Sequence, residues 1–174
     1  MSERTGIVTM MGNPVTLLGD EPKVGDRAPE FEVMDNHLKT VKFSTFENKI
    51  TIIASVPSLD TPICDKETRR FNEIASELGP EVEIITISMD LPFAQERWCR
   101  EARVDKLRTY SDHRDASFGM SYGVLIKELR LLARAVYVID AKGVIRHVQL
   151  VHEIGEEPNY DEALKEIRKL LQVE

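Results

Sequence analysis

The sequence predicts an α/β fold in which a central mixed β-sheet is flanked by helices. Short runs of β-branched and apolar residues, typical of buried strands, alternate with longer segments of helical periodicity. Two of these runs, 50–56 and 82–88, enclose a helical segment at 62–78, which favours a parallel strand pair joined by a crossover helix. A strong hairpin signal at 141–143 separates two later strands, so the sheet should also contain an antiparallel pair.

Local signals define the individual elements in chain order. Residues 6–19 predict two short strands around a turn at 12–14, and residues 30–35 and 39–43 predict a second hairpin. The remaining predicted elements are strand 50–56, helix 62–78, strand 82–88, a helix from 92 to about 103, a short strand at 108–111, a mostly irregular stretch at 112–133, strands 135–140 and 144–151, and a helix from about 159. In this order the elements resemble a thioredoxin-like fold preceded by an N-terminal β-hairpin.

Length and composition limit the classes of function. A chain of 174 residues is expected to form one domain, here residues 1–174. The formal net charge is −7 without any block of basic residues, which argues against nucleic acid or an anionic membrane surface as a partner. No apolar run reaches the roughly 18 residues of a membrane span, and Asn13-Pro14 interrupts the apolar stretch near the N-terminus, unlike a signal peptide. We therefore expect a cytoplasmic protein.

The link between strand 50–56 and helix 62–78 is the most informative segment. Thr61 suits the N-cap of the helix, and Pro62 suits its first position, where a missing N–H has no cost. Cys64 is then the third helical residue. A sulfur there faces unpaired backbone N–H groups and the positive end of the helix dipole, and both favour thiolate over thiol. The sequence therefore predicts a reactive thiol at Cys64.

A second cysteine, Cys99, lies in the predicted helix after strand 82–88. A reducing cytosol disfavours a permanent structural disulfide between Cys64 and Cys99. From the residues alone, the two cysteines could equally be unrelated buried thiols, because free cysteine is among the most buried residue types. The predicted position of Cys64 at the start of a helix favours a reactive thiol there. Nothing in the sequence around Cys99 indicates that its thiol is reactive.

Several sequence stretches together resemble one known family. The pattern Pro57-x3-Thr61-x2-Cys64 resembles the active-site signature of the peroxiredoxins, and the full run Pro57-Ser-Leu-Asp-Thr-Pro-Ile-Cys64 resembles the bacterial thiol peroxidases in particular. Stretches 12–17, 24–31, 88–95 and 133–136 resemble the same subgroup in the same order. The resemblance covers about residues 7–172, nearly the whole chain.

The resemblance implies a role for five residues. Cys64 corresponds to the peroxidatic cysteine, which attacks a peroxide oxygen and becomes a sulfenic acid. Thr61 corresponds to the threonine that hydrogen-bonds the thiolate and orients the peroxide, and Pro57 to the proline that covers the sulfenic acid from water. Arg134 corresponds to the arginine that holds the thiolate and polarises the substrate. Cys99 corresponds to the resolving cysteine, on the helix after the peroxidatic one.

The same resemblance implies a catalytic cycle. Cys64 and Cys99 would form an intramolecular disulfide that thioredoxin reduces, in a homodimer that acts on hydrogen peroxide and organic hydroperoxides and prefers alkyl hydroperoxides. The chemistry agrees, since peroxide reduction needs a thiolate nucleophile, a cation for the developing alkoxide charge and a second thiol to trap the sulfenic acid. We expect no metal and no other cofactor, because the scheme needs neither haem nor flavin.

Simpler interpretations of two of these side chains remain open. Taken alone, Arg134 fits a surface salt bridge at the start of a strand, and Trp98 fits a core or groove-lining residue rather than part of a cofactor site. A thioredoxin-like fold can also serve as a chaperone or binding module, or as a peroxide sensor, because fold alone does not determine function. Fast, peroxide-dependent loss of the Cys64 thiol would distinguish an enzyme from a binding module.

Two other site chemistries use histidine. The chain contains His37, His113, His147 and His152. A Cys–His hydrolase needs a base beside its cysteine, and the sequence places no histidine next to Cys64 and carries no hydrolase signature. A zinc site could in principle use both cysteines with the last two histidines, but their spacing matches no recognised site.

Overall fold

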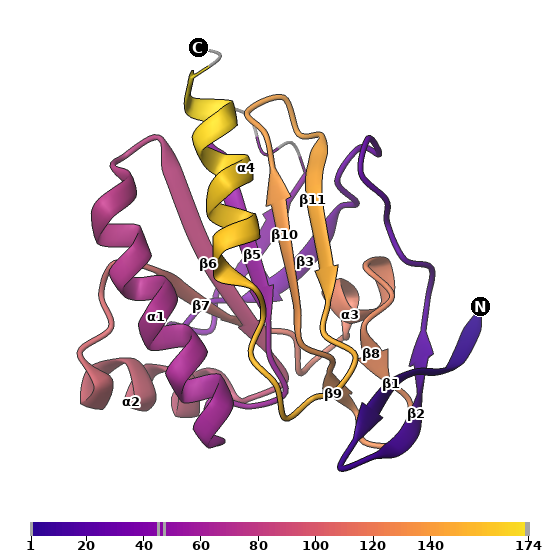
Figure 1. The fold of residues 1–174 in the computed structure, drawn as a ribbon. Helices are drawn as coiled ribbons and strands as arrows, with labels where there is room; N and C mark the ends of the chain where they lie inside the picture. The colour runs from indigo at the N-terminus through magenta and orange to yellow at the C-terminus, as the bar shows by residue number, and fades with distance from the viewer. Residues whose placement is uncertain (1, 45, 47, 173–174) are drawn as a thin grey trace.

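A computed structural model describes residues 2–44, 46 and 48–172 of the chain (Figure 1). The elements in chain order are β1 (Glu3–Met10), β2 (Asn13–Leu18), β3 (Phe31–Met34), β4 (Thr40–Phe43), β5 (Ile50–Ser55), α1 (Pro62–Leu78), β6 (Val82–Ser88), α2 (Pro92–Ala102), β7 (Arg108–Ser111), α3 (Ser117–Ser121), β8 (Leu125–Ile126), β9 (Leu131–Leu132), β10 (Ala135–Ile139), β11 (Ile145–Leu150) and α4 (Tyr160–Gln172).

The strands form a large mixed sheet and a small antiparallel one. The large sheet has the strand order β11-β10-β5-β6-β7-β3-β4, and the small sheet has the order β1-β2-β8-β9. In the large sheet, β5, β6 and β7 are parallel neighbours, whereas β10 and β3 flank them in antiparallel pairs. The predicted mixed sheet, with parallel strands joined through α1 and a late antiparallel hairpin of β10 and β11, is confirmed.

Both faces of the large sheet are covered. Helices α1 and α4 cross one face, and α3 with the small sheet lies against the other (Figure 1). All six residues of β5 are therefore buried: Ile52 belongs to the core under α1 and α4, and Ile53 to the core on the opposite face. A strand buried on both faces needs apolar side chains in succession, which explains the continuous β-branched run in the sequence.

The first hairpin differs slightly from its prediction. Strands β1 and β2 pair as expected, but the two-residue turn is Met11-Gly12, and Asn13 and Pro14 already belong to β2. Both turn residues have positive φ, as a tight hairpin turn that matches strand twist requires. Pro14 is tolerated near the start of a strand because little hydrogen bonding is lost there.

The stretch 112–133, predicted to be mostly irregular, contains α3, β8 and β9, so that prediction was wrong. Strands β8 and β9 have two residues each, and β8 takes its hydrogen bonds from β2, with Leu18 opposite Leu125. The short helix α3 is stabilised by Asp112, whose carboxylate accepts the backbone N–H groups of Phe118 and Gly119. Of these elements, β8 depends on a partner distant in the chain, whereas β9 pairs with β8 and α3 is held by the nearby Asp112. Segments of two to five residues without periodicity give no clear local signal.

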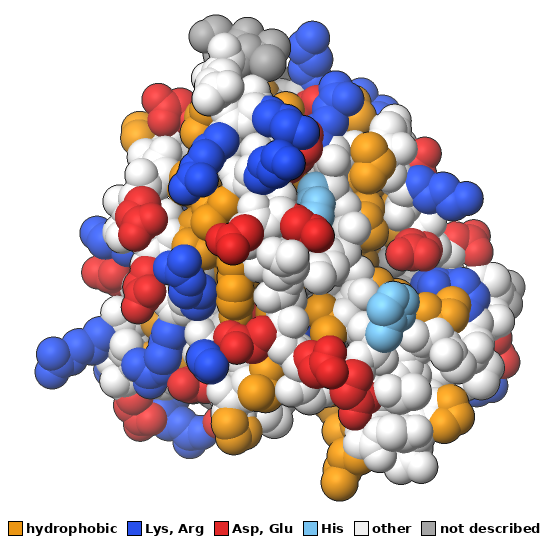
Figure 2. Space-filling view, viewed as in Figure 1, with side chains coloured by type: hydrophobic (Ala, Val, Ile, Leu, Met, Phe, Trp, Pro, Cys, Tyr) orange, Lys and Arg blue, Asp and Glu red, His pale blue; other side chains and the backbone are white. Residues whose placement is uncertain are grey.

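The surface over α1 and α4 is highly charged. Figure 2 shows acidic and basic side chains interspersed over this face, with apolar side chains between them. Among the described residues, no helix combines the length and the apolar character needed to cross a membrane.

Candidate active site

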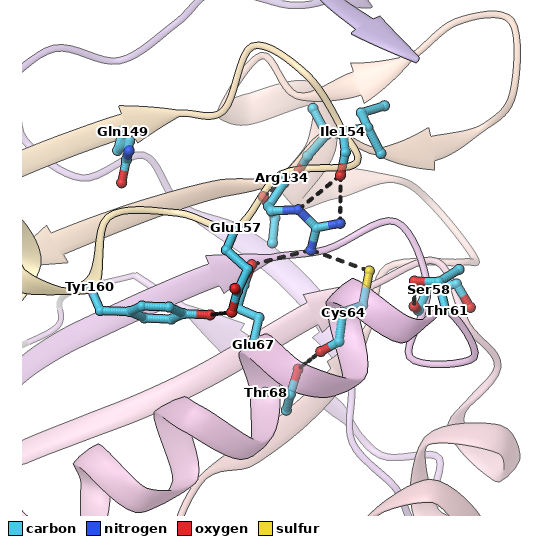
Figure 3. Close-up of polar contacts among 12 residues, drawn as sticks. Ser58, Thr61, Cys64, Glu67, Thr68, Arg134, Gln149, Ile154, Glu157 and Tyr160 are labelled. Atoms are coloured by element: carbon cyan, nitrogen blue, oxygen red, sulfur yellow. Dashed lines mark hydrogen bonds and ion pairs between the residues drawn. The ribbon is translucent and has the colours of Figure 1, made fainter. Parts of the chain in front are cut away.

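Cys64 lies where the sequence predicts it, in the first turn of α1. Helix α1 begins at Pro62 with Thr61 at its N-cap, which makes Cys64 the third helical residue. The Cys64 side chain has an exposed fraction of 0%, and its sulfur accepts a hydrogen bond from Arg134 Nη1 at 3.3 Å (Figure 3). The thiol is therefore held at a helix N-terminus beside a fixed cation, and both surroundings favour the negatively charged thiolate.

Arg134 is a buried site residue. Its exposed fraction is 1%, which excludes the interpretation as a surface salt bridge. Its Nε and Nη2 atoms both donate to the carbonyl oxygen of Ile154, at 3.2 and 2.8 Å. This bidentate contact orients the guanidinium so that Nη1 points at Cys64 Sγ and at Glu67 Oε1, which lies 3.2 Å away (Figure 3).

Glu67 completes the centre, and the sequence analysis missed it. It lies one turn after Cys64 on the same face of α1, and its side chain is fully buried. Burial raises the pKa of the Glu67 carboxyl group to about 8, although the nearby positive charge and hydrogen bond of Arg134 act in the opposite direction. The carboxyl group therefore holds a proton more readily than an exposed glutamate does, and Arg134 Nη1 is shared between this group and the Cys64 sulfur. A carboxylate three residues after the cysteine, within the apolar face of α1, was the available signal.

A second acidic residue, Glu157, lies near this centre and is partly exposed. Glu157 accepts a hydrogen bond from the Tyr160 hydroxyl at 2.8 Å and forms an ion pair with Lys66 at 3.1 Å. The Tyr160 hydrogen bond lowers the pKa of Glu157, and Lys66 lowers it further, so this carboxylate stays ionised. Its negative charge in turn raises the pKa of Glu67.

The loop before α1 is fastened to the end of β6. Asp90, two residues after β6, accepts hydrogen bonds from Ser58 Oγ at 2.7 Å and from the Leu59 backbone N–H at 2.9 Å. Because β5 and β6 are parallel neighbours, both loops leave the same edge of the sheet, where ligand sites of such sheets form. Pro57 lies buried in this loop, and its predicted shielding of the sulfenic acid stays a prediction.

Thr61 occupies the N-cap, but its hydroxyl does not serve as predicted in this structure. Thr61 Oγ1 donates to the Ser58 carbonyl at 2.8 Å and makes no capping bond to the helix. Its side chain is exposed, and none of the hydrogen bonds of the described residues joins it to Cys64 Sγ. The local loop satisfies the hydroxyl first, as threonine in turns commonly does. The expected contact with the thiolate is therefore not formed in this state.

Cys99 lies on α2 with a different set of neighbours. Its thiol is partly buried, and Sγ lies 3.5 Å from Thr109 Oγ1 of β7. Burial raises the pKa of the Cys99 thiol, the nearby Glu96 charge raises it further, and the Thr109 hydrogen bond opposes this change. Both cysteines are free, and their sulfurs contact different residues.

Among the described residues, no histidine forms a hydrogen bond with Cys64 Sγ. The hydrogen-bond partner of Cys64 Sγ is Arg134, whereas the ring of His152 contacts the carbonyl oxygen of Ile7. Within the part of the chain that the structure describes, no group of three or more His, Cys, Asp or Glu side chains is arranged to hold a metal ion.

The chain is similar to a known protein family over most of its length. The family described as Redoxin matches residues 23–164. The thiol peroxidase of Bacillus subtilis is 50% identical over 164 residues, which are 94% of this chain and 98% of that protein. The chain belongs to the bacterial thiol peroxidases of the redoxin family. A thiol peroxidase of Listeria innocua is 49% identical over 93% of this chain and 98% of its own length.

Solved structures agree with this family. A peroxiredoxin-like protein from Aquifex aeolicus has a TM-score of 0.89 and 45% identity, and the match covers 96% of this chain and 97% of that one. A thiol peroxidase from Chromobacterium violaceum, at 21% identity, has the same fold with a TM-score of 0.85 over 96% and 98% of the two chains. The predicted thioredoxin-like fold and the predicted class of enzyme, a peroxiredoxin-type thiol peroxidase, are confirmed.

Proposed function

We propose that Cys64 is the peroxidatic residue of this thiol peroxidase and that Cys99 resolves its oxidised form. The observation that carries the proposal is the 3.3 Å contact between Arg134 Nη1 and Cys64 Sγ inside a fully buried site. A buried cation needs an anionic partner. Arg134 Nη1 contacts both Cys64 Sγ and Glu67 Oε1, and burial raises the pKa of the Glu67 carboxyl group, which favours the Cys64 thiolate as the anionic partner.

In the first step, the Cys64 thiolate attacks one oxygen of the peroxide. The S–O bond forms while the O–O bond breaks, and the leaving alkoxide or hydroxide takes up a proton to become an alcohol or water. Arg134 stabilises the attacking thiolate and the charge that moves to the leaving oxygen, a role that suits a guanidinium already held in place by Ile154. Cys64 is left as a sulfenic acid.

In the second step, Cys99 attacks the sulfenic acid. The thiol of Cys99 and the sulfenic acid of Cys64 give one disulfide and one water molecule. Since the two sulfurs contact Arg134 and Thr109 in the reduced protein, the first turn of α1 and the end of α2 must move before they can bond.

The catalytic cycle also needs a reductant that converts the disulfide back to two thiols. A dithiol reductant of the thioredoxin type would reduce the Cys64–Cys99 disulfide by thiol–disulfide exchange. A preference for alkyl hydroperoxides over hydrogen peroxide, a homodimeric state and a cytoplasmic location stay predictions.

The proposal is tested with two variants and a thiol count. Cys64→Ser should abolish peroxide consumption and leave the fold intact. Cys99→Ser should reduce one equivalent of peroxide, accumulate sulfenic acid at Cys64 and lose turnover with thioredoxin. Mass spectrometry of the oxidised wild-type protein should find the Cys64–Cys99 disulfide. Substantial peroxide turnover in Cys64→Ser, or normal thioredoxin-dependent turnover in Cys99→Ser, would contradict the assignment.

A further inference from the structure

Three side chains join α1 to α2 immediately beside the two cysteines. Asp65 directly follows Cys64, and Trp98 directly precedes Cys99. The indole Nε1 of Trp98 donates to Asp65 Oδ1 at 2.9 Å, and Asp65 Oδ2 accepts from Arg69 Nε at 2.9 Å. The guanidinium carbon of Arg69 lies 5.8 Å from the centroid of the Trp98 ring. We call Asp65, Arg69 and Trp98 the clasp.

The three residues of the clasp all contact one another, and two of these contacts join α1 to α2. Helix α2 lies beside the first turns of α1 (Figure 1), and the clasp contact between Asp65 and Trp98 joins them there. Trp98 has an exposed fraction of only 9% and packs in the same core cluster as Cys64. A hydrogen bond to a carboxylate and a cation over an indole face are each stronger than ordinary surface contacts, and both gain from partial burial.

The positions of the sulfurs explain why the clasp has to open. Cys64 Sγ points at Arg134 in the interior, and Cys99 Sγ points at Thr109 on β7. A disulfide requires Cα atoms roughly 4.4–6.8 Å apart with the two side chains directed at each other. Turning the backbone at Cys64 and at Cys99 also turns the adjacent residues Asp65 and Trp98.

We propose that opening of the clasp limits how quickly Cys99 reaches the Cys64 sulfenic acid, which makes Asp65, Arg69 and Trp98 positioning residues for disulfide formation. The inference rests on the proposed function of the two cysteines. While the clasp is closed, the sulfenic acid stays in the folded site beside Arg134. When the clasp opens, the first turn of α1 is free to unwind toward α2.

The clasp thereby sets the balance between two reactions of the same sulfenic acid. When the Cys64 sulfenic acid reacts with the Cys99 thiol, the products are a disulfide and water. When the Cys64 sulfenic acid reacts with a second peroxide molecule, the peroxide transfers one oxygen to the sulfur and leaves as an alcohol or water, and the product is a sulfinic acid. The first reaction needs the clasp open, and the second needs only the folded site. A weaker clasp should therefore give more disulfide and less sulfinic acid.

The test measures this product ratio in purified full-length protein treated with cumene hydroperoxide. Trp98→Phe removes the indole donor and keeps an aromatic ring in the core. Mass spectrometry measures the ratio of disulfide to sulfinic acid at a fixed peroxide concentration. In Trp98→Phe this ratio should be about tenfold higher than in the wild-type protein, because one hydrogen bond to a charged group is lost. Asp65→Asn keeps the acceptor oxygen but loses the charge that holds Arg69, and should raise the ratio less. Glu73→Gln is the matched control, since it removes an ion pair with Arg70 that stays within α1.

A spectroscopic readout separates the clasp from general stability. Trp98 is the only tryptophan of the chain, so its fluorescence reports directly on the clasp. In the wild-type protein, a change in Trp98 emission should accompany disulfide formation at the same rate, and Asp65→Asn should shift the emission of the reduced protein. Wild-type product ratios in both clasp variants, or a disulfide that forms without any change in emission, would overturn the inference. Failure of the proposed function would show differently, as the absence of the sulfenic acid or of the Cys64–Cys99 disulfide in the wild-type protein itself.

Discussion

Replacing Glu67 by glutamine should make the stability of the protein less dependent on pH. Burial raises the pKa of Glu67 to about 8 in the folded protein, against 4.5 for an ordinary glutamate. The folded state therefore binds this proton more tightly than the unfolded state does. By linkage, the contribution of this proton to the free energy of unfolding is complete below pH 4.5 and is lost as the pH rises to about 8.

The expected effect is large enough to measure. Each unit of pKa difference corresponds to about 1.4 kcal/mol. Between about pH 5 and pH 8, the free energy of unfolding of the chain with Glu67 should therefore fall by up to about 4 kcal/mol relative to the Glu67→Gln variant. Glutamine is a close match in size and still accepts a hydrogen bond from Arg134, but it does not titrate.

The assay is urea unfolding of both proteins at several pH values across this range. Both carry Cys64→Ser, so that titration and oxidation of the thiol do not contribute. The chain with Glu67 should lose stability with rising pH relative to the Glu67→Gln variant, most steeply in the middle of the range. Parallel stability profiles would refute the reasoning that burial outweighs the Arg134 charge at this carboxyl group.

Two further predictions concern the surroundings of Cys64. Arg134→Ala should slow the first oxidation of Cys64 by about 100- to 1000-fold, because it removes a fixed donor to the reacting atoms; single-turnover stopped-flow kinetics in a Cys99→Ser background measure this step, and an unchanged rate would contradict the assigned role. Asp90→Ala should lower the free energy of unfolding by about 1–3 kcal/mol, because it leaves the loop donors of Ser58 and Leu59 without their acceptor. Urea unfolding tests this, with Asp60→Ala, at an exposed position of the same loop, as the control.

Local signals predicted those parts of the fold that local interactions determine. Helix α1 was placed correctly at both ends, because Thr61-Pro62 starts it and Gly79-Pro80 follows its last residue. Strands β8 and β9 were missed, because β8 pairs with β2, more than a hundred positions away in the chain, and β9 joins the sheet only through β8. A two-residue strand has no periodicity, so only its partner defines it.

The same distinction applies to the site. The helix-start signals Thr61 and Pro62 correctly predicted the position of Cys64 in the first turn of α1. Arg134 was predicted only through the family resemblance, since nothing in its own segment indicates that it is buried. The roles of the Ile154 carbonyl and of the buried Glu67 were not predicted at all. Both groups contact Arg134, which brings together α1 and the segment that follows β11, and this meeting of distant segments is a property of the three-dimensional fold.

The contact between Arg134 and the Ile154 carbonyl has a consequence for mutational tolerance. A carbonyl oxygen belongs to the backbone, so every amino acid at position 154 supplies the same acceptor. The side chain at this position affects the guanidinium only through its own packing, since Ile154 is buried in the core. The position of the carbonyl depends instead on the length and path of the connection between β11 and α4. An insertion or deletion there would displace the acceptor and turn the arginine away from the sulfur, even though no residue that touches Cys64 had been replaced.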